Sequence, residues 1–129
     1  MQAIILAAGM GKRLGELTQN NTKCMVKVHK QTLIERMLAQ LSLLNLKRII
    51  LVIGYKGEKV KELVGNKIGG TPILYIENPV YDKTNNIYSL YLAKNYLIED
   101  DTLLLESDLI FSDTILSKLI NNPYPNLAV

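Results

Sequence analysis

Alternation between strand-like runs and helical patterns constrains the fold of this chain more than any other feature. The strand-like runs are Gln2–Leu6, Arg48–Ile53, Pro72–Glu77 and Thr102–Glu106. Short, strongly apolar runs that end in turn residues are typical of strands buried on both faces of a parallel sheet. Because helical segments separate these runs, the sequence predicts an α/β fold with a mostly parallel sheet.

The segments between the runs have the periodicity of helices. Thr32 and Glu35 match a capping box, in which each side chain satisfies a backbone amide of the other. An apolar stripe follows at helical spacing and consists of Leu33, Ile34, Met37, Leu38, Leu41 and Leu44. Further helices are expected at 58–64, from Asn85 or Asn86 to about 97, and at 114–120. We therefore expect helices on both faces of the sheet, in a Rossmann-like three-layer α/β/α arrangement.

The length of 129 residues suits one domain with one modest core. Residues 126–129 have the composition of a strand entry, so we expect a truncated domain. No apolar run reaches the roughly 20 residues that span a bilayer. The single cysteine, Cys24, cannot form an internal disulfide, which favours a cytoplasmic location.

The loop after the first run carries the strongest functional signal. Its sequence is Leu6-Ala7-Ala8-Gly9-Met10-Gly11-Lys12-Arg13-Leu14. Glycines let a backbone approach a polyphosphate closely, and Lys12 and Arg13 supply positive charge. The dinucleotide fingerprint does not fit, because Leu14 stands where its third glycine belongs. The P-loop does not fit either, because Gly11-Lys12 lacks the four-residue spacer and the following Ser or Thr.

This loop resembles the signature of the nucleotidyltransferases that activate sugar phosphates and choline phosphate, Leu-Ala-Ala-Gly-x-Gly-x-Arg-Leu. The resemblance implies a nucleotide-diphospho-sugar transferase-like fold. It also implies that residues 1–129 are the N-terminal nucleotide-binding portion of such a domain, with the C-terminal acceptor-binding part absent. The loop residues that it assigns to nucleotide binding are Leu6, Ala7, Ala8, Gly9, Gly11, Lys12 and Arg13.

Two further positions resemble functional residues of the family. Lys23 occupies the place of a lysine that contacts phosphates, although Thr22 replaces the proline that usually precedes it. Asp108 follows the last strand-like run and matches an aspartate that coordinates Mg²⁺ against the triphosphate. The resemblance therefore implies Mg²⁺ as the cofactor, with Arg13 and Lys23 as catalytic residues. The Gly54-Tyr55 turn also resembles the family and is expected to be structural.

The Asn85-Asn86 pair indicates a subgroup of the family. It stands where sugar-phosphate members usually have a glycine-rich stretch, and it is similar to the bacterial choline-phosphate cytidylyltransferases and their aminoalkylphosphonate relatives. Amide side chains offer both donors and an acceptor to the edge of a pyrimidine. The alternative is that one of the two asparagines only caps the following helix.

The resemblance thus predicts an Mg²⁺-dependent enzyme that transfers CMP from CTP to phosphocholine or a similar phosphorylated small molecule, with release of pyrophosphate. A sugar-1-phosphate nucleotidyltransferase that uses UTP, GTP or dTTP is one alternative, and a non-catalytic nucleotide-binding domain is another. The family takes a second metal-binding carboxylate from the half that follows, so this chain alone is expected to turn over poorly. Nucleic-acid and membrane partners are not expected, whereas an unpaired sheet edge would favour self-association into a homo-oligomer.

Overall fold

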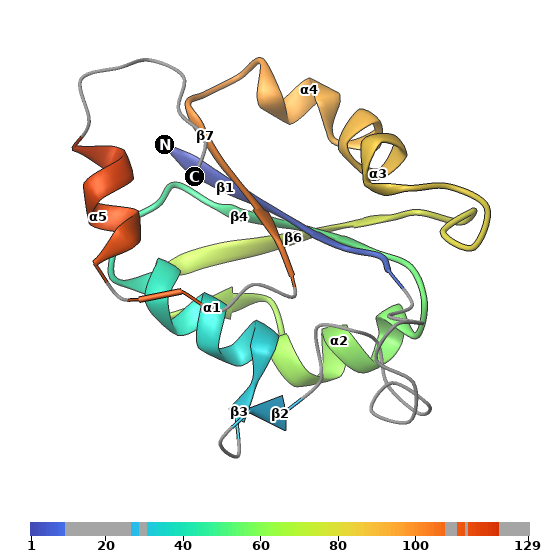
Figure 1. The fold of residues 1–129 in the computed structure, drawn as a ribbon, viewed down its shortest axis with the longest axis horizontal. Coiled ribbons are helices and arrows are strands. Elements are labelled where there is room, and N and C mark those ends of the chain that lie inside the picture. The colour runs from blue at the N-terminus through green and yellow to red at the C-terminus, as the bar shows by residue number, and fades with distance from the viewer. Residues whose placement is uncertain (10–26, 29–30, 108–110, 113, 122–129) are drawn as a thin grey trace.

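A central sheet organises the computed structural model, which describes residues 1–9, 27–28, 31–107, 111–112 and 114–121 (Figure 1). Within these residues the sheet has five strands in the order β5-β6-β4-β1-β7. The bounds are β1 Gln2–Ala7, β4 Ile49–Ile53, β5 Lys67–Ile68, β6 Thr71–Glu77 and β7 Thr102–Glu106. Strands β6, β4, β1 and β7 run parallel, and only the short β5 is antiparallel to its neighbour. The prediction of a mostly parallel sheet is therefore confirmed.

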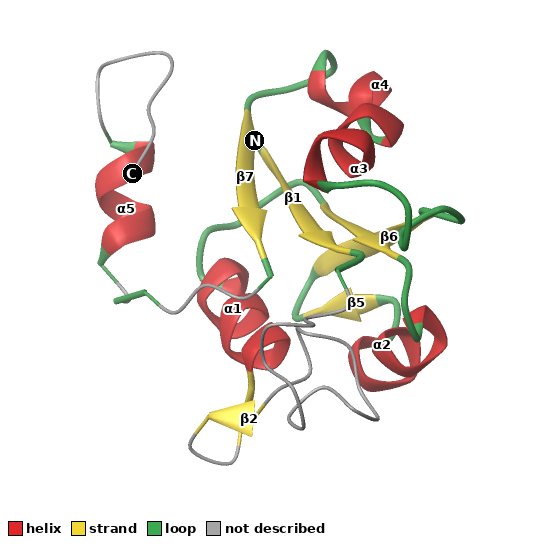
Figure 2. Ribbon diagram, turned by 45° about the vertical axis from the view of Figure 1, so that its right-hand side comes forward, coloured by secondary structure: helices red, strands yellow, loops and turns green. Residues whose placement is uncertain are grey.

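Helices cover both faces of this sheet (Figure 1). On one side lie α1 (Leu33–Ser42), α2 (Gly57–Val64) and α5 (Ile115–Ile120), and on the other lie α3 (Asn86–Leu92) and α4 (Lys94–Leu97). Val60 of α2 and Leu116 of α5 join the same apolar cluster as the inner side of α1. Figure 2 shows the two groups of helices on either side of the strands. The predicted three-layer α/β/α arrangement is confirmed.

Strand β1 explains why the sequence begins with an unbroken apolar run. All of its residues are buried, and the same holds for β4 beside it. Because side chains alternate along a strand, Ala3, Ile5 and Ala7 enter the core against α1. Ile4 and Leu6 enter the second core, against α3 and α4. A strand with helices on both sides has no face on which a polar residue could meet water.

Helix α1 begins where its capping box predicts. The backbone amide of Glu35 donates to the Thr32 hydroxyl at 3.1 Å, and the amide of Thr32 donates to the Glu35 carboxylate at 3.3 Å. Thr32 also ends a short antiparallel ladder that the sequence did not predict, between β2 (Lys27–Val28) and β3 (Gln31–Thr32). Strands of two residues are too short to leave a periodic signal.

The helix predicted from residue 85 or 86 to about 97 is divided, so its continuity was wrong. The break lies at Ala93, whose amide donates to the Leu90 carbonyl at 3.0 Å, a tighter turn than that of an α-helix. Ala93 is fully buried against the face of the sheet that carries Ile4, Leu6, Ile50 and Val52. Its small side chain lets the backbone approach the strands closely. The helix is therefore interrupted by packing on the sheet, although no glycine or proline lies at the break.

The remaining predicted elements lie within a few residues of their observed bounds. The β7 run is matched at both ends, and α2 and β6 each begin one residue earlier than predicted. Strand β5 was not predicted, and the strand entry expected at 126–129 lies outside the described residues. In the part of the chain that the structure describes, no helix combines the length and apolarity needed to cross a membrane.

A buried amide ties the strands together at their amino ends. Gln2 is fully buried, and its Nε2 donates to the Tyr96 carbonyl and, at 2.9 Å, to the Thr102 hydroxyl. Its Oε1 accepts a hydrogen bond of 2.7 Å from Arg48, which also pairs with Glu99 at 2.6 Å. This network joins β1, β7 and α4 at the edge of the sheet opposite the carboxyl ends of the strands.

Gln2→Ala should lower the free energy of unfolding by about 2 kcal/mol, because it removes the hydrogen bonds of a fully buried side chain to Tyr96, Thr102 and Arg48. Urea denaturation measures this change. Gln31→Ala, which removes the same side chain from an exposed position, should stay within about 0.5 kcal/mol of the parent. Equal stability of the two variants would show that the network contributes nothing.

The N-terminal ammonium group lies 3.0 Å from the Asp100 carboxylate, and their hydrogen bond holds the pKa of Asp100 below its ordinary value. A lowered pKa in the folded state gives stability that is present above the ordinary pKa and is lost as pH falls through the folded one. Asp100→Asn should therefore destabilise the protein near neutral pH, and the difference from the parent should disappear in strong acid. Unfolding curves at both pH values test this, with Asp101→Asn as the control. A constant difference at both pH values would contradict it.

Candidate functional site

The strand order creates a switch point between β1 and β7. From β1 the chain continues to β4 and then β6 on one side, and it later returns to place β7 on the other side. The connections that leave the carboxyl ends of β1 and β4 therefore diverge from the one that leaves β7. Open α/β sheets bind ligands at the carboxyl edge where the connections diverge in this way.

The residues at this switch point come from the ends of both strands. Ala8 and Gly9 follow β1, and Glu106 ends β7 beside Leu6. The amide of the buried Ser107 donates to the Leu6 carbonyl at 3.2 Å, which holds the two strand ends together. The glycine loop thus leaves the sheet next to an exposed carboxylate of the neighbouring strand.

Helix α3 also contributes a side chain at the switch point between β1 and β7. The Asn86 Nδ2 donates to the Glu106 Oε1 at 2.6 Å, although 20 residues separate them in the chain. Asn85 precedes the helix as its N-cap, and its Oδ1 accepts from the Ile87 amide at 3.1 Å. Asn85 therefore caps α3, whereas Asn86 is directed to the end of β7, and the base contact predicted for the pair stays a prediction.

Glu106 received no role in the sequence analysis, yet it is the residue that Asn86 contacts. The signal was available in the sequence, because Glu106 is an acidic residue at the carboxyl end of a strand. Asp108, two residues later, received its predicted role from the resemblance. What the sequence could not show is the contact itself, because it depends on how α3 packs across the sheet.

A buried asparagine fixes the loop between β6 and α3. Asn78 is 2% exposed, and its Nδ2 donates to the hydroxyls of Thr84 at 3.1 Å and Ser89 at 3.2 Å. Its Oδ1 accepts from the Val80 amide at 3.0 Å. A single side chain thus joins the end of the strand, both ends of the loop and the buried side of α3.

Gly54 allows this loop to pack against the end of β1. A Cβ atom at this position would lie 2.7 Å from the Tyr81 Cβ and 3.1 Å from the Ala8 Cβ. The neighbouring rings of Tyr55 and Tyr81 are 5.9 Å apart between centroids. The expectation of a structural role for the Gly54-Tyr55 turn is therefore supported by close contact with the residue before Gly9.

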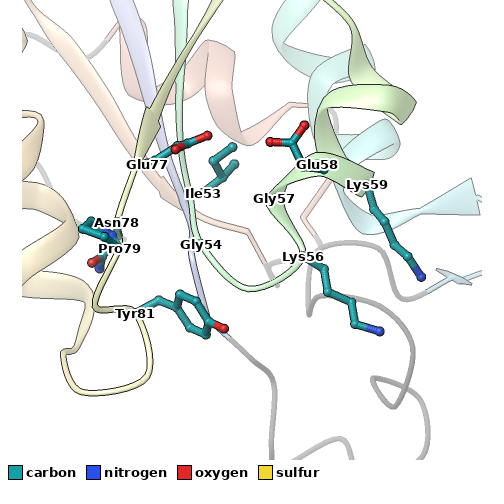
Figure 3. Close-up of a pocket in the computed structure, with 10 residues that line it drawn as sticks. All are labelled: Ile53, Gly54, Lys56, Gly57, Glu58, Lys59, Glu77, Asn78, Pro79 and Tyr81. Carbon is teal, nitrogen blue, oxygen red and sulfur yellow. The ribbon is translucent and has the colours of Figure 1, made fainter.

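A cleft of about 520 Å³ opens beside the Gly54 turn, at the carboxyl ends of β4 and β6 (Figure 3). Tyr81 lies along one side of it, and Glu58 and Glu77 lie at the far end with their carboxylates directed toward one another. Lys61 pairs with Glu77 at 2.9 Å and with Glu58 at 3.6 Å. The Glu77 hydrogen bond is the main cause of a raised pKa for Lys61. The single ammonium group of Lys61 therefore offsets only part of the negative charge of these two carboxylates.

The structure places only part of the predicted site. Leu6, Ala7 and Ala8 are buried, so any ligand contact that they make must use backbone atoms. Gly9 is half-buried and is the last residue of the glycine loop that the structure describes, so only the start of this loop is placed. The predicted residues Gly11, Lys12, Arg13, Lys23 and Asp108 lie outside the described residues. Asn85 and Asn86 are both exposed.

Oxygen donors are present at the switch point, but the described residues do not complete a metal site. Among them, no group of three or more His, Cys, Asp or Glu side chains could hold a metal ion. Glu106 supplies a carboxylate of the kind that Mg²⁺ prefers. Asp108, the predicted ligand, follows it by two residues, so the donor type fits Mg²⁺ while the coordination remains a prediction.

The sequence matches a known domain family over nearly its whole length. The family model described as "MobA-like NTP transferase domain" matches residues 3–128. The chain is 35% identical over 123 residues to the CMP-5'-(3-aminopropyl)phosphonate synthase of Streptomyces rubellomurinus, covering 95% of this chain and 19% of that protein.

Two further relatives differ in the nucleotide they use. A choline-phosphate cytidylyltransferase of Streptococcus pneumoniae is 36% identical, with 83% of this chain and 47% of that protein covered. A UTP–glucose-1-phosphate uridylyltransferase of Haloferax volcanii is 31% identical, with 87% and 45% covered. The chain spans about half the length of each of these two relatives.

A solved structure confirms the predicted fold. The CTP:phosphocholine cytidylyltransferase of Streptococcus pneumoniae superposes with a TM-score of 0.75 at 35% identity, over 88% of this chain and 48% of that one. The nucleotide-diphospho-sugar transferase-like fold implied by the glycine loop is therefore present.

Gly54→Ala should lower the free energy of unfolding by about 1–3 kcal/mol, because the added methyl group overlaps Tyr81 and Ala8. Gly70→Ala is the matched control, since nothing lies within 4 Å of a Cβ at that position. Its effect should be neutral or slightly stabilising. The unfolding temperatures of both variants test this prediction. Equal unfolding temperatures would show that Gly54 is not needed for the packing of Tyr81 against Ala8.

Proposed function

The chain belongs to the MobA-like NTP transferase domain family, and on that premise we propose that it is the nucleotide-binding part of an Mg²⁺-dependent cytidylyltransferase. The reaction would transfer CMP from CTP to phosphocholine or a similar phosphorylated small molecule and release pyrophosphate. Its cytoplasmic location, its self-association and the lack of nucleic-acid and membrane partners stay predictions.

The contact between Asn86 and Glu106 beside the start of the glycine loop carries this proposal. It puts an amide and a carboxylate at the switch point, beside Leu6 at the end of β1, where a nucleotide would bind. Relatives whose names include choline-phosphate and 2-aminoethylphosphonate cytidylyltransferase support CTP as the nucleotide. They also support an acceptor that combines a phosphate or phosphonate with an amino or ammonium group.

The proposed chemistry needs no covalent intermediate with the protein. An oxygen of the acceptor phosphate attacks the α-phosphorus of CTP, a new phosphorus–oxygen bond forms, and the bond to the leaving pyrophosphate breaks. The protein contributes mainly position and charge. Backbone amides from Gly9 to Gly11, with Lys12 and Arg13, would hold the β- and γ-phosphates.

Lys23 would offset the charge of the α-phosphate or of the attacking phosphate. Asp108 would hold Mg²⁺, which neutralises the triphosphate charge when bound. Two of the cytidylyltransferase relatives are about twice as long as this chain, so the acceptor pocket and a second carboxylate ligand are proposed to come from a part that this sequence does not contain.

One alternative is a sugar-1-phosphate nucleotidyltransferase, which the uridylyltransferase relative of Haloferax volcanii supports. The Asn85-Asn86 pair favours the cytidylyltransferase over it. The second alternative is a nucleotide-binding domain without turnover.

The proposal is tested by measuring pyrophosphate release with Mg²⁺. CTP, UTP, GTP and ATP are each supplied with phosphocholine, aminoethylphosphonate or glucose-1-phosphate. This chain and a version extended beyond residue 129 are compared. We expect activity with CTP and an aminoalkyl acceptor, and only in the extended version. A preference for glucose-1-phosphate would establish the first alternative, and nucleotide binding without turnover in either version would establish the second.

In the active form, Arg13→Ala and Asp108→Ala should each lower kcat/KM by about 100-fold or more, because each removes charge that stabilises the transition state. Lys118→Ala is the control, since Lys118 is an exposed cation on α5. Steady-state kinetics that leave the Arg13 and Asp108 variants as active as the Lys118 variant would refute their assigned roles.

A further inference from the structure

We infer that Glu106 is a positioning residue that makes this site prefer cytosine over uracil, by fixing which group Asn86 offers to a base. The inference rests on the proposed function, since it requires the Asn85-Asn86 pair to contact the nucleobase. It goes beyond that function because it assigns the choice of nucleotide to a contact between α3 and the end of β7.

The contact with Glu106 fixes the orientation of the Asn86 amide. An ionised carboxylate can only accept hydrogen bonds, so the NH₂ group of Asn86 must face it. The distance of 2.6 Å from Nδ2 to Oε1 is short, as expected for a bond to a charged acceptor. The Oδ1 of Asn86 has no hydrogen-bond partner among the described residues and is left as an acceptor.

Asn85 has the opposite arrangement. Its Oδ1 is occupied as the cap of α3, where it accepts from the Ile87 amide at 3.1 Å. Its NH₂ group therefore remains as a donor. Two adjacent and identical side chains thus differ in what they offer to a ligand, and the difference comes from Glu106 on one side and the helix terminus on the other.

Cytosine matches this pair and uracil does not. Cytosine carries an amino group at C4, which is a donor, beside the unprotonated N3, which is an acceptor. Uracil carries a carbonyl oxygen at C4 beside N3–H, so both positions are reversed. With uracil the Asn86 carbonyl would face another acceptor, and the Asn85 NH₂ would face another donor. A site with fixed polar groups rejects a base that leaves them unpaired.

The surrounding loop keeps the pair from rearranging. Asn78 holds Thr84, which immediately precedes Asn85, and it holds Ser89 on the buried side of α3. The Thr84 hydroxyl also donates to the Val80 carbonyl at 2.8 Å. Since the start of α3 is held from both sides, the Asn86 amide would have to turn about its own side-chain bonds to present NH₂ instead. Glu106 opposes that turn.

Glu106→Gln tests the inference because it keeps the size of the side chain and changes its donor and acceptor pattern, while the lost charge affects CTP and UTP equally. A glutamine amide can donate to the Asn86 carbonyl or accept from its NH₂, so both orientations of Asn86 become available. Dissociation constants of CTP and UTP, each with Mg²⁺, are measured for this chain by NMR titration. The parent should bind CTP roughly tenfold to a hundredfold more tightly than UTP. In Glu106→Gln and in Glu106→Ala the ratio should fall toward one.

Glu62→Gln provides the matched control, since it makes the same change on the exposed side of α2 and should leave the ratio unchanged. The inference would be overturned if the parent bound CTP and UTP equally well, or if both Glu106 variants kept the preference for CTP. Either result would leave nucleotide binding itself intact. A parent that binds neither CTP nor UTP would overturn the proposed function as well. The side-chain NH₂ signals of Asn86 give a readout without ligand, because Glu106→Ala should shift them while Glu62→Gln should not.

Discussion

The burial of β1 on both faces is the constraint on which the rest of this structure depends. β1 pairs with β4 on one side and β7 on the other, and its side chains alternate between two cores. Because the chain passes from β1 to β4 on one side and returns only later to β7 on the other, β1 ends where the connections diverge. The glycine loop therefore leaves the sheet at the switch point because of the strand order. The position of the loop is therefore set by the packing of the sheet, whereas its proposed chemistry depends on the residues of the loop itself.

Contacts on either side of the loop's first residues then shape the site. On one side the missing side chain of Gly54 lets Tyr81 approach Ala8. On the other, Asn86 meets Glu106 at the end of β7. The buried amide of Asn78 links both sides, because the loop that it holds carries Tyr81 and leads directly to Asn86. The polar network of Gln2 and Arg48 lies at the opposite edge of the sheet, away from the proposed nucleotide site.

Much of this could be predicted from the sequence, because the governing signals are local. Apolar runs located the strands, and Thr32 with Glu35 located the start of α1. The break at Ala93 could not be predicted, because it follows from close packing on the sheet without any helix-breaking residue. The partnership of Asn86 with Glu106 was also beyond the sequence, since 20 residues separate them and only the crossing of α3 brings them together. The predicted roles of Arg13, Lys23 and Asp108 rest on resemblance and stay predictions.

The most direct test of the central claim is to map nucleotide contacts on the ¹⁵N-labelled chain by NMR, with CTP and Mg²⁺ added. If the switch point binds the nucleotide, amide signals should move at Gly9, Asn86 and Ser107, where the ends of β1 and β7 meet α3. Signals of Gln2 and Arg48, at the opposite edge of the sheet, should stay in place. Shifts confined to that opposite edge, or none near Gly9 when binding occurs, would contradict the account.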